Sequence, residues 1–245
     1  MARYVLPSGI LLDANLDHPG RHARGRPPGH RRMTFRDRTE AGRRLAAALS
    51  HLRNRDDLLV LALPRGGVPV AAEVARILNA PLDLYFAHKI SAPDNPEYAV
   101  GSVAETGPPY VEEQVIQNLR IPFSYVREEA AFQQAALARR SRFYRGDRPG
   151  PPIEGKCVIL VDDGVATGFT AHAALQSLRN RIPARLVFAT PVAAADSVQR
   201  LAIDADELAI LHAPAIFFAV GDFYDEFLQV SDDEVIALLK NSVPA

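Results

Sequence analysis

Short apolar runs alternate along the chain with segments whose apolar positions follow a helical period. Largely apolar runs at 58–63, 82–87, 157–161, 186–190 and 208–212 have the length of buried strands. Helices are expected over 34–52, with Thr34 as the N-cap, and over 69–79, 112–119, 125–143, 170–181 and 196–202. This alternation predicts an α/β fold with a doubly wound, mostly parallel sheet. In such sheets ligands bind beyond the carboxyl ends of the strands.

Residues 1–33 differ from the rest of the chain. The stretch 18–32 is rich in Arg, His, Pro and Gly and has few side chains to bury. We expect a flexible basic extension over 1–33, followed by a single domain over 34–245. Three interpretations of this extension are considered. It is an arm that binds phosphate or nucleic acid, a solvated tail, or the result of an upstream start codon with Met33 as the usual first residue.

The overall composition limits the partners that need to be considered. The chain has 245 residues and a formal net charge of -1, so charge alone does not attract it to nucleic acid or anionic lipid. The apolar runs are too short to span a bilayer, and no membrane partner is expected. Cys157 is the only cysteine. Without an intramolecular disulfide the chain fits a reducing compartment, and we expect a cytoplasmic location.

The segment 158–170 combines the most chemically informative residues. A hydrophobic strand brings two adjacent carboxylates, Asp162 and Asp163, to its end, and a loop of small residues leads to a helix at Thr170. Loop N–H groups, the hydroxyls of Thr167 and Thr170 and a helix N-terminus suit a phosphate. Paired carboxylates suit the cis-diol of a ribose, because each ionised oxygen accepts a hydrogen bond. Together they indicate a ribose 5-phosphate site made of Asp162, Asp163, Gly164, Val165, Ala166, Thr167, Gly168 and Thr170.

This segment resembles the phosphoribosyl pyrophosphate motif of the type I phosphoribosyltransferases: a hydrophobic strand, paired acids and a Thr-Gly-x-Thr loop. The resemblance runs from about residue 34 to the C-terminus. It implies the doubly wound, mostly parallel sheet of that family with a C-terminal hood region. A response-regulator receiver also has paired acids at a strand end, but they lie near its first strand and it lacks this phosphate loop.

A second segment, 61–72, resembles the pyrophosphate loop of the same family, a strand followed by Arg-Gly-Gly and a helix. Gly66 and Gly67 allow the backbone to approach an anion, and Arg65 adds a planar, permanently charged donor. A tight strand-to-helix turn with Arg65 in solvent is the alternative interpretation.

The third segment, 88–105, begins with a basic pair. Lys89 matches the lysine of the Arg-Lys pair of adenine-type members, while His88 departs from the arginine. The resemblance implies that Lys89 meets the pyrophosphate and that the residues after it form a mobile loop that closes over substrate. Glu97 and Glu105 in this loop are candidates for general acid or base catalysis. A surface hairpin without a catalytic role is the alternative.

The fourth segment, 217–227, resembles the region of hypoxanthine-guanine-type members in which an acid near the metal lies beside aromatics that cover the base. Asp222 is then the candidate metal-binding acid, and Phe217, Phe218 and Phe223 are candidates for stacking on the base. These aromatics could equally belong to the core. Ala166 stands where those members have an acid, so hypoxanthine and guanine are expected to be poor acceptors.

The resemblance implies a Mg²⁺-dependent enzyme of nucleotide salvage. It would transfer the phosphoribosyl group of phosphoribosyl pyrophosphate to a nitrogenous base or related small-molecule acceptor and release pyrophosphate, with Arg65, Lys89 and Glu97 as catalytic residues. Two alternatives are a non-catalytic regulator of the same fold that senses phosphoribosyl pyrophosphate and binds nucleic acid, and a phosphoribosyl pyrophosphate synthetase relative. The basic extension alone supports the regulator, so nucleic acid is not expected as a partner. A homodimer is left open.

Overall fold

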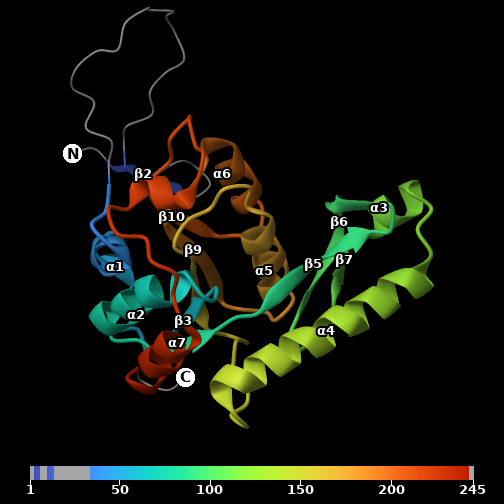
Figure 1. Ribbon diagram of the computed structural model, residues 1–245, viewed down its shortest axis with the longest axis horizontal. Coiled ribbons are helices and arrows are strands. Elements are labelled where there is room, and N and C mark those ends of the chain that lie inside the picture. The colour runs from blue at the N-terminus through green and yellow to red at the C-terminus, as the bar shows by residue number, and fades with distance from the viewer. Residues whose placement is uncertain (1–2, 6–9, 14–33, 243–245) are drawn as a thin grey trace, which may run out of the picture.

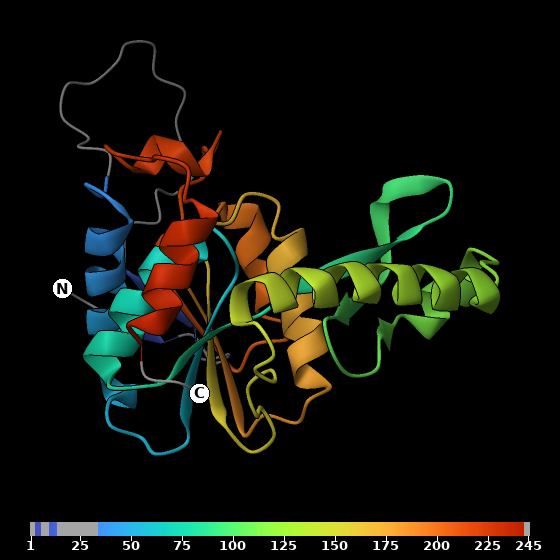
Figure 2. The same ribbon diagram turned by 60° about the horizontal axis from the view of Figure 1, so that its bottom comes forward.

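The structure is a computed structural model that describes residues 3–5, 10–13 and 34–242, with side chains from residue 34 on except those of Pro96 and Glu97. It consists of a main α/β body and an arm that projects from it (Figures 1 and 2). The α/β class and the mostly parallel sheet predicted from the sequence pattern are confirmed.

The main sheet has seven strands in the order β1-β2-β10-β9-β8-β3-β4. All neighbouring pairs are parallel except β1 with β2. The neighbouring interior strands β3 and β8 are buried at every position, which explains why they appear as continuous apolar runs. The strands are β1 (Arg3–Val5), β2 (Ile10–Asp13), β3 (Leu58–Ala62), β4 (Leu82–Leu84), β8 (Cys157–Val161), β9 (Arg185–Val192) and β10 (Glu207–His212).

Helices cover both faces of this sheet, as a doubly wound fold requires (Figure 1). On one face, side chains of α1, α2 and α7 pack with Val60 of β3 and Ile159 of β8. On the other, α5 and α6 pack with Leu61 of β3 and Leu160 of β8. The bounds of these helices are α1 (Arg38–Ala48), α2 (Gly67–Leu78), α5 (Phe169–Arg179), α6 (Ala195–Leu201) and α7 (Asp232–Lys240).

Residues 87–145 form the arm. A three-stranded antiparallel sheet of order β5-β6-β7 packs against the long helix α4, and the short helix α3 lies at its far end (Figures 1 and 2). Residues 87–104 therefore form a hairpin, whose catalytic role stays a prediction. The expected strand 82–87 is wrong in extent, because the chain leaves the main sheet after Leu84 and enters the arm at Ala87. The arm consists of β5 (Ala87–Ala92), β6 (Asn95–Ala104), β7 (Tyr110–Val111), α3 (Glu113–Asn118) and α4 (Phe123–Arg145).

A buried arginine joins the arm to the main sheet. The Arg145 guanidinium donates to Asp83 at 2.6 Å, to Glu105 at 2.5 Å and to the carbonyl of Leu84. The Arg145 side chain is 1% exposed, so its buried positive charge has to be balanced by these two carboxylates.

The expected start of the first helix needs correction. Helix α1 does not begin at Thr34: Asp37 is its N-cap and accepts from the backbone N–H of Glu40 at 2.7 Å. The preceding Phe35 is fully buried and forms a parallel bridge with Tyr224, so this stretch is extended rather than helical. A carboxylate cap at Asp37 is as favourable as a hydroxyl cap.

Strands β1 and β2 fall inside the segment assigned to a flexible extension. Strand β2 pairs in parallel with β10, the last strand of the expected core. The apolar run Ile10 to Leu12 and the free edge of β10 explain this pairing. The basic stretch 18–32 lies outside the described residues, so the boundary at residue 33 stays a prediction.

None of the described helices is long and apolar enough to cross a membrane.

Candidate active site

The predicted phosphate loop lies between the carboxyl end of β8 and the start of α5. It is fixed to β9, because the N–H of Val165 donates to the carbonyl of Val192 at 2.9 Å. Gly168 has a φ of 76°, a left-handed conformation that suits glycine and turns the chain into α5. Ala166, Thr167 and Thr170 are exposed. The loop is therefore anchored at its base and open where a phosphate would bind.

The two acids at the end of β8 are in different environments. Asp163 forms an ion pair with Arg38 of α1, with 2.8 Å between Oδ2 and Nε, and both side chains are largely buried. Burial and the neighbouring Asp163 carboxylate raise the pKa of Asp162 well above its ordinary value. The two acids therefore do not share one role: Asp163 supports the fold, and Asp162 is the partly exposed member of the pair.

The predicted pyrophosphate loop lies directly against these acids. A Cβ added at Gly66 would overlap the carboxylate of Asp163, and one added at Gly67 would be 2.7 Å from the carbonyl oxygen of Val161. Both contacts are closer than real Cβ atoms allow, so only glycine fits. The peptide bond between Pro64 and Arg65 is cis. The two segments singled out from the sequence thus meet at the carboxyl ends of neighbouring strands β3 and β8.

Arg65 points from this loop toward the C-terminal helix. Its Nη1 is 3.4 Å from Asp232 Oδ1 at the start of α7, and Tyr144 of α4 donates to the same carboxylate oxygen. About a third of the Arg65 side chain and nearly half of that of Asp232 are exposed. Such a pair contributes little stability and can be exchanged for a pair with a more highly charged anion.

Lys89 reaches the phosphate loop from the arm. Its Nζ lies 5.1 Å from the ring centre of Phe169, the first residue of α5. The Arg200 guanidinium lies 4.3 Å from the same ring centre and donates to the carbonyl of Thr167 at 2.7 Å. Two cationic groups therefore lie beside the loop whose exposed hydroxyls suit a phosphate.

The C-terminal segment covers one side of the loop. A Cβ added at Gly164 would overlap the side chain of Val220, which begins the 3-10 turn η2 (Val220–Phe223). The hydroxyl of Tyr224 donates to the carbonyl of Asp163 at 2.6 Å. The segment predicted as the hood therefore packs against the phosphoribosyl motif.

The predicted base-stacking aromatics do not share one role. Phe223 is 1% exposed and packs against Phe217 and His212, so its assignment as a base platform is wrong and it belongs to the core. Phe218 is 81% exposed, and Phe217 is partly buried. Asp222 is exposed on η2. The roles of Phe217, Phe218 and Asp222 stay predictions.

The two glutamates proposed for proton transfer also differ. Glu105 is 8% exposed and bound to Arg145, so it is unavailable as an acid or base. Glu97 lies on β6, and its side chain is outside the described part of the structure. It stays a prediction.

The donor set suits magnesium only together with a phosphorylated ligand. Among the described residues there is no group of three or more His, Cys, Asp or Glu side chains that could hold a metal. The carboxylates near the loops, Asp162 and Asp222, are hard oxygen donors of the kind that Mg²⁺ prefers. The residues therefore fit a Mg²⁺ ion held mainly by ligand oxygens.

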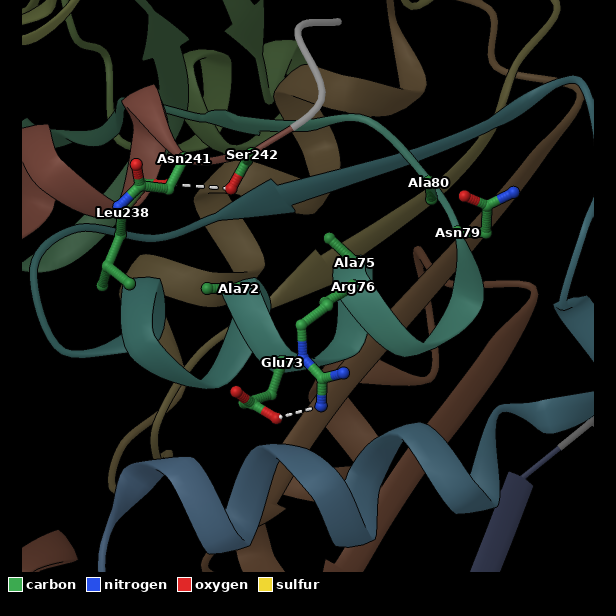
Figure 3. A pocket seen from close by; sticks show the side chains of 9 residues that line it. All are labelled: Ala72, Glu73, Ala75, Arg76, Asn79, Ala80, Leu238, Asn241 and Ser242. Atoms are coloured by element: carbon green, nitrogen blue, oxygen red, sulfur yellow. Dashed lines mark hydrogen bonds and ion pairs between the residues drawn. The ribbon is translucent and has the colours of Figure 1, made fainter.

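A separate cavity of about 320 Å³ lies between α2 and α7 (Figure 3). It borders the second half of α2, whereas Gly67 of the pyrophosphate loop begins that helix. Glu73 and Arg76 form an ion pair on its wall at 2.8 Å. This cavity does not belong to the candidate site.

Sequence reasoning missed several residues of the site. Arg38 and Arg200 come from helices that the pattern reveals only as amphipathic. Asp232 begins a helix that was not predicted, and Tyr224 falls among other aromatics. A signal existed for Asp232, because Ser231 followed by three acids is a typical helix start.

Comparison with known proteins identifies the family of this chain. The sequence model of the phosphoribosyl transferase domain family matches residues 36–227. The chain therefore belongs to the phosphoribosyltransferase family.

Two relatives from Mycobacterium tuberculosis, MT0597 (strain CDC 1551 / Oshkosh) and Rv0571c (strain H37Rv), are each 42% identical over 205 residues. Both are provisionally named as phosphoribosyl transferases. The match covers 84% of this chain but 46% of each relative, so the chain spans about half the length of these curated relatives. The crystal structure of TT1426 from Thermus thermophilus is 44% identical, with a TM-score of 0.78, and the match covers 84% of this chain and 98% of that one.

Proposed function

We propose that this chain is an enzyme that transfers the 5-phosphoribosyl group of phosphoribosyl pyrophosphate to a nitrogenous base or a related small-molecule acceptor and releases pyrophosphate. Membership of the family supports a phosphoribosyl pyrophosphate-dependent transfer in general. The observation that carries the proposal is the contact between Gly66 and Asp163, because it joins two loops suited to anions into one site. We further propose that the reaction serves nucleotide salvage in the cytoplasm.

In this proposal the two loops hold opposite ends of the donor substrate. Thr167 and Thr170, with the N-terminus of α5, would bind the 5-phosphate, and Asp162 would accept from a ribose hydroxyl. Arg65 would leave the exposed carboxylate of Asp232 and bind the more highly charged pyrophosphate together with Lys89. Both ends of the ribose would then be fixed while the bond at C1 breaks.

The protein has to stabilise charge rather than supply a nucleophile. Pyrophosphate departs with the bonding electrons, leaving an oxocarbenium-like ribose that the acceptor nitrogen attacks. Arg65 and Lys89 would favour departure by stabilising the negative charge that develops on the leaving group. Bound Mg²⁺ would neutralise part of the pyrophosphate charge, with Asp222 as the candidate protein ligand.

The acceptor is proposed to be one that needs no acid beside the phosphate loop. Ala166 is exposed in the loop and carries only a methyl group, so it cannot exchange a proton with a purine ring. Hypoxanthine and guanine should therefore be poor acceptors. Glu97 on the β5–β6 hairpin is the proposed proton-transfer group, and Glu97→Gln should lower kcat more than it weakens donor binding.

The proposal is tested by incubating the protein with Mg²⁺, phosphoribosyl pyrophosphate and a panel of purines, pyrimidines and aromatic acids while measuring pyrophosphate release. We expect acceptor-dependent release with one class of base and little with hypoxanthine or guanine. Phe218→Ala should raise the KM for the acceptor if this exposed ring covers the base.

Donor binding without turnover of any acceptor would favour the regulator of the same fold. The basic stretch 18–32, on which the regulator alternative depends, would then be examined for nucleic-acid binding that weakens with salt.

A further inference from the structure

Helix α4 has one buried and one exposed side. Its inner side carries the buried Val126, Ala130 and Leu137, which face the core, where α4 packs against β5 and β6 of the arm. Figures 1 and 2 show the opposite side along the edge of the arm, where no other described element covers it. We define the outer face of α4 by the exposed residues Arg127, Glu128, Phe132, Ala135, Arg142 and Phe143.

Two large aromatic side chains project from this outer face. Phe132 is 65% exposed and Phe143 is 61% exposed. They lie eleven residues apart, close to three helical turns, and therefore share one side of the helix. Exposed aromatics grouped in this way are typical of surfaces that bind another protein.

The outer face is complementary in charge to the same face of a second copy that runs antiparallel to it. Glu128 lies seven residues before Ala135, and Arg142 lies seven residues after it. In an antiparallel pair centred on Ala135, each Glu128 therefore meets Arg142 of the second copy. The same reversal brings Arg127, eight residues before the centre, to Phe143, eight residues after it, which suits a cation–π contact.

We propose that the outer face of α4 binds the same face of a second copy of this chain, antiparallel and about a twofold axis at Ala135. A parallel pair would oppose Glu128 to Glu128 and Arg142 to Arg142, which is unfavourable. The antiparallel pair replaces both repulsions by attractions and buries Phe132 against Ala138 of the other copy. Both residues are exposed in the single chain.

The small side chain at the centre allows the helices to approach closely. From Arg127 to Phe143 the helix rises about 24 Å, and an alanine at the crossing point permits an interaxial distance of about 8 Å. An interface of one helix per copy is at the small end of the range for specific complexes. The dimer should therefore dissociate on dilution in the micromolar range.

This surface is separate from the candidate active site. The site is formed by loops at the carboxyl ends of β3 and β8, whereas the outer face belongs to α4 in the projecting arm (Figure 2). Dimer formation can therefore be tested whether or not the proposed reaction is found.

The test uses sedimentation velocity of the full chain over a wide micromolar concentration range. The wild-type protein should show a concentration-dependent dimer. Glu128→Arg and Arg142→Glu should each weaken dimerisation at least about tenfold, because each places like charges opposite one another. The two single variants mixed together should form a heterodimer, since every Arg then meets a Glu. The double variant should again form a homodimer.

Two exposed charges elsewhere provide matched controls. Arg53→Glu and Glu154→Arg make the same charge changes on the main body and should leave the dimer unchanged. Circular dichroism would show that all variants are folded. A monomer at every concentration would overturn the proposal, as would a dimer that neither single variant weakens or a mixture of the two that fails to associate.

Discussion

Asp162 and Asp163 show how two identical neighbouring side chains acquire different roles. Asp163 is bound to Arg38, and its carbonyl accepts from Tyr224, so it connects β8 to α1 and to the C-terminal segment. Asp162 accepts a hydrogen bond from the backbone N–H of Asp163, but burial and the second carboxylate disfavour its charge and raise its pKa. Strongly perturbed pKa values of this kind cluster at functional sites.

Replacing Asp162 by Asn should stabilise the protein without ligand. A raised pKa means that the stabilising effect is complete below the ordinary aspartate value and is lost as pH rises through the folded-state pKa. Wherever Asp162 is ionised, its charge therefore destabilises the fold, and Asp162→Asn should raise Tm. Thermal unfolding at a series of pH values should show a gap between variant and wild type that widens as the pH rises above the ordinary aspartate pKa. An equal or lower Tm of the variant at every pH would contradict this account.

Replacing Asp163 by Asn should have the opposite effect. It leaves the largely buried Arg38 without its carboxylate and should cost about 2 kcal/mol of the free energy of unfolding. Asp57→Asn is the matched control, because its pair with Arg55 is about 40% exposed and should contribute little. Chemical denaturation of the two variants measures the loss of free energy of unfolding in each. Equal effects would mean that the Arg38 pair behaves as a surface pair.

At the scale of elements, the pyrophosphate loop depends on close packing against β8. A Cβ at Gly67 would lie 2.7 Å from the backbone oxygen of Val161, which cannot move without disturbing the strand. Gly67→Ala should therefore lower Tm and weaken donor binding together. Gly150→Ala, whose Cβ would have its nearest neighbour at 3.9 Å, is the control. Thermal unfolding and calorimetry of both variants test this, and an unaffected Gly67→Ala protein would show that the loop is not held against β8.

The elements of the core were predictable because their signals are local. Buried strands such as β3 and β8 appear as continuous apolar runs, and the phosphate loop has a short motif. The break after Leu84 was not predictable, because the run 82–87 is largely apolar. Its end depends on Arg145, about sixty residues later, which binds Asp83 and Glu105.

The candidate site was only partly predictable, because only some of its features are local in sequence. Its backbone features, the glycines and the loop, follow from neighbouring residues. The partners Arg38, Arg200 and Asp232 meet the loops through tertiary packing, which a single sequence does not reveal. Which aromatics are exposed also depends on tertiary packing. From the sequence alone, the buried Phe223 and the exposed Phe218 therefore looked like equal candidates for stacking on the base.

At the scale of the whole molecule, the described site residues come from residue 38 onward. A chain that begins at Met33 should therefore fold and bind the donor substrate. It loses the pairing of β2 with β10, so its Tm should be lower than that of the full chain. Thermal unfolding and calorimetry of the truncated chain test this expectation. A folded truncated chain that does not bind the donor would place part of the site in the first 32 residues.

The central claim is that the loops after β3 and β8 form a single site for phosphoribosyl pyrophosphate. Calorimetric titration with phosphoribosyl pyrophosphate and Mg²⁺ tests it most directly, with the wild-type chain and Asp162→Asn compared at the same pH. The wild type should bind, and the variant should bind at least about tenfold more weakly, because a charge-assisted hydrogen bond to ligand contributes about 1.5 to 3 kcal/mol. Its higher Tm would show that the loss is not due to unfolding. Equal affinity of the two proteins, or no binding by the wild type, would contradict the account.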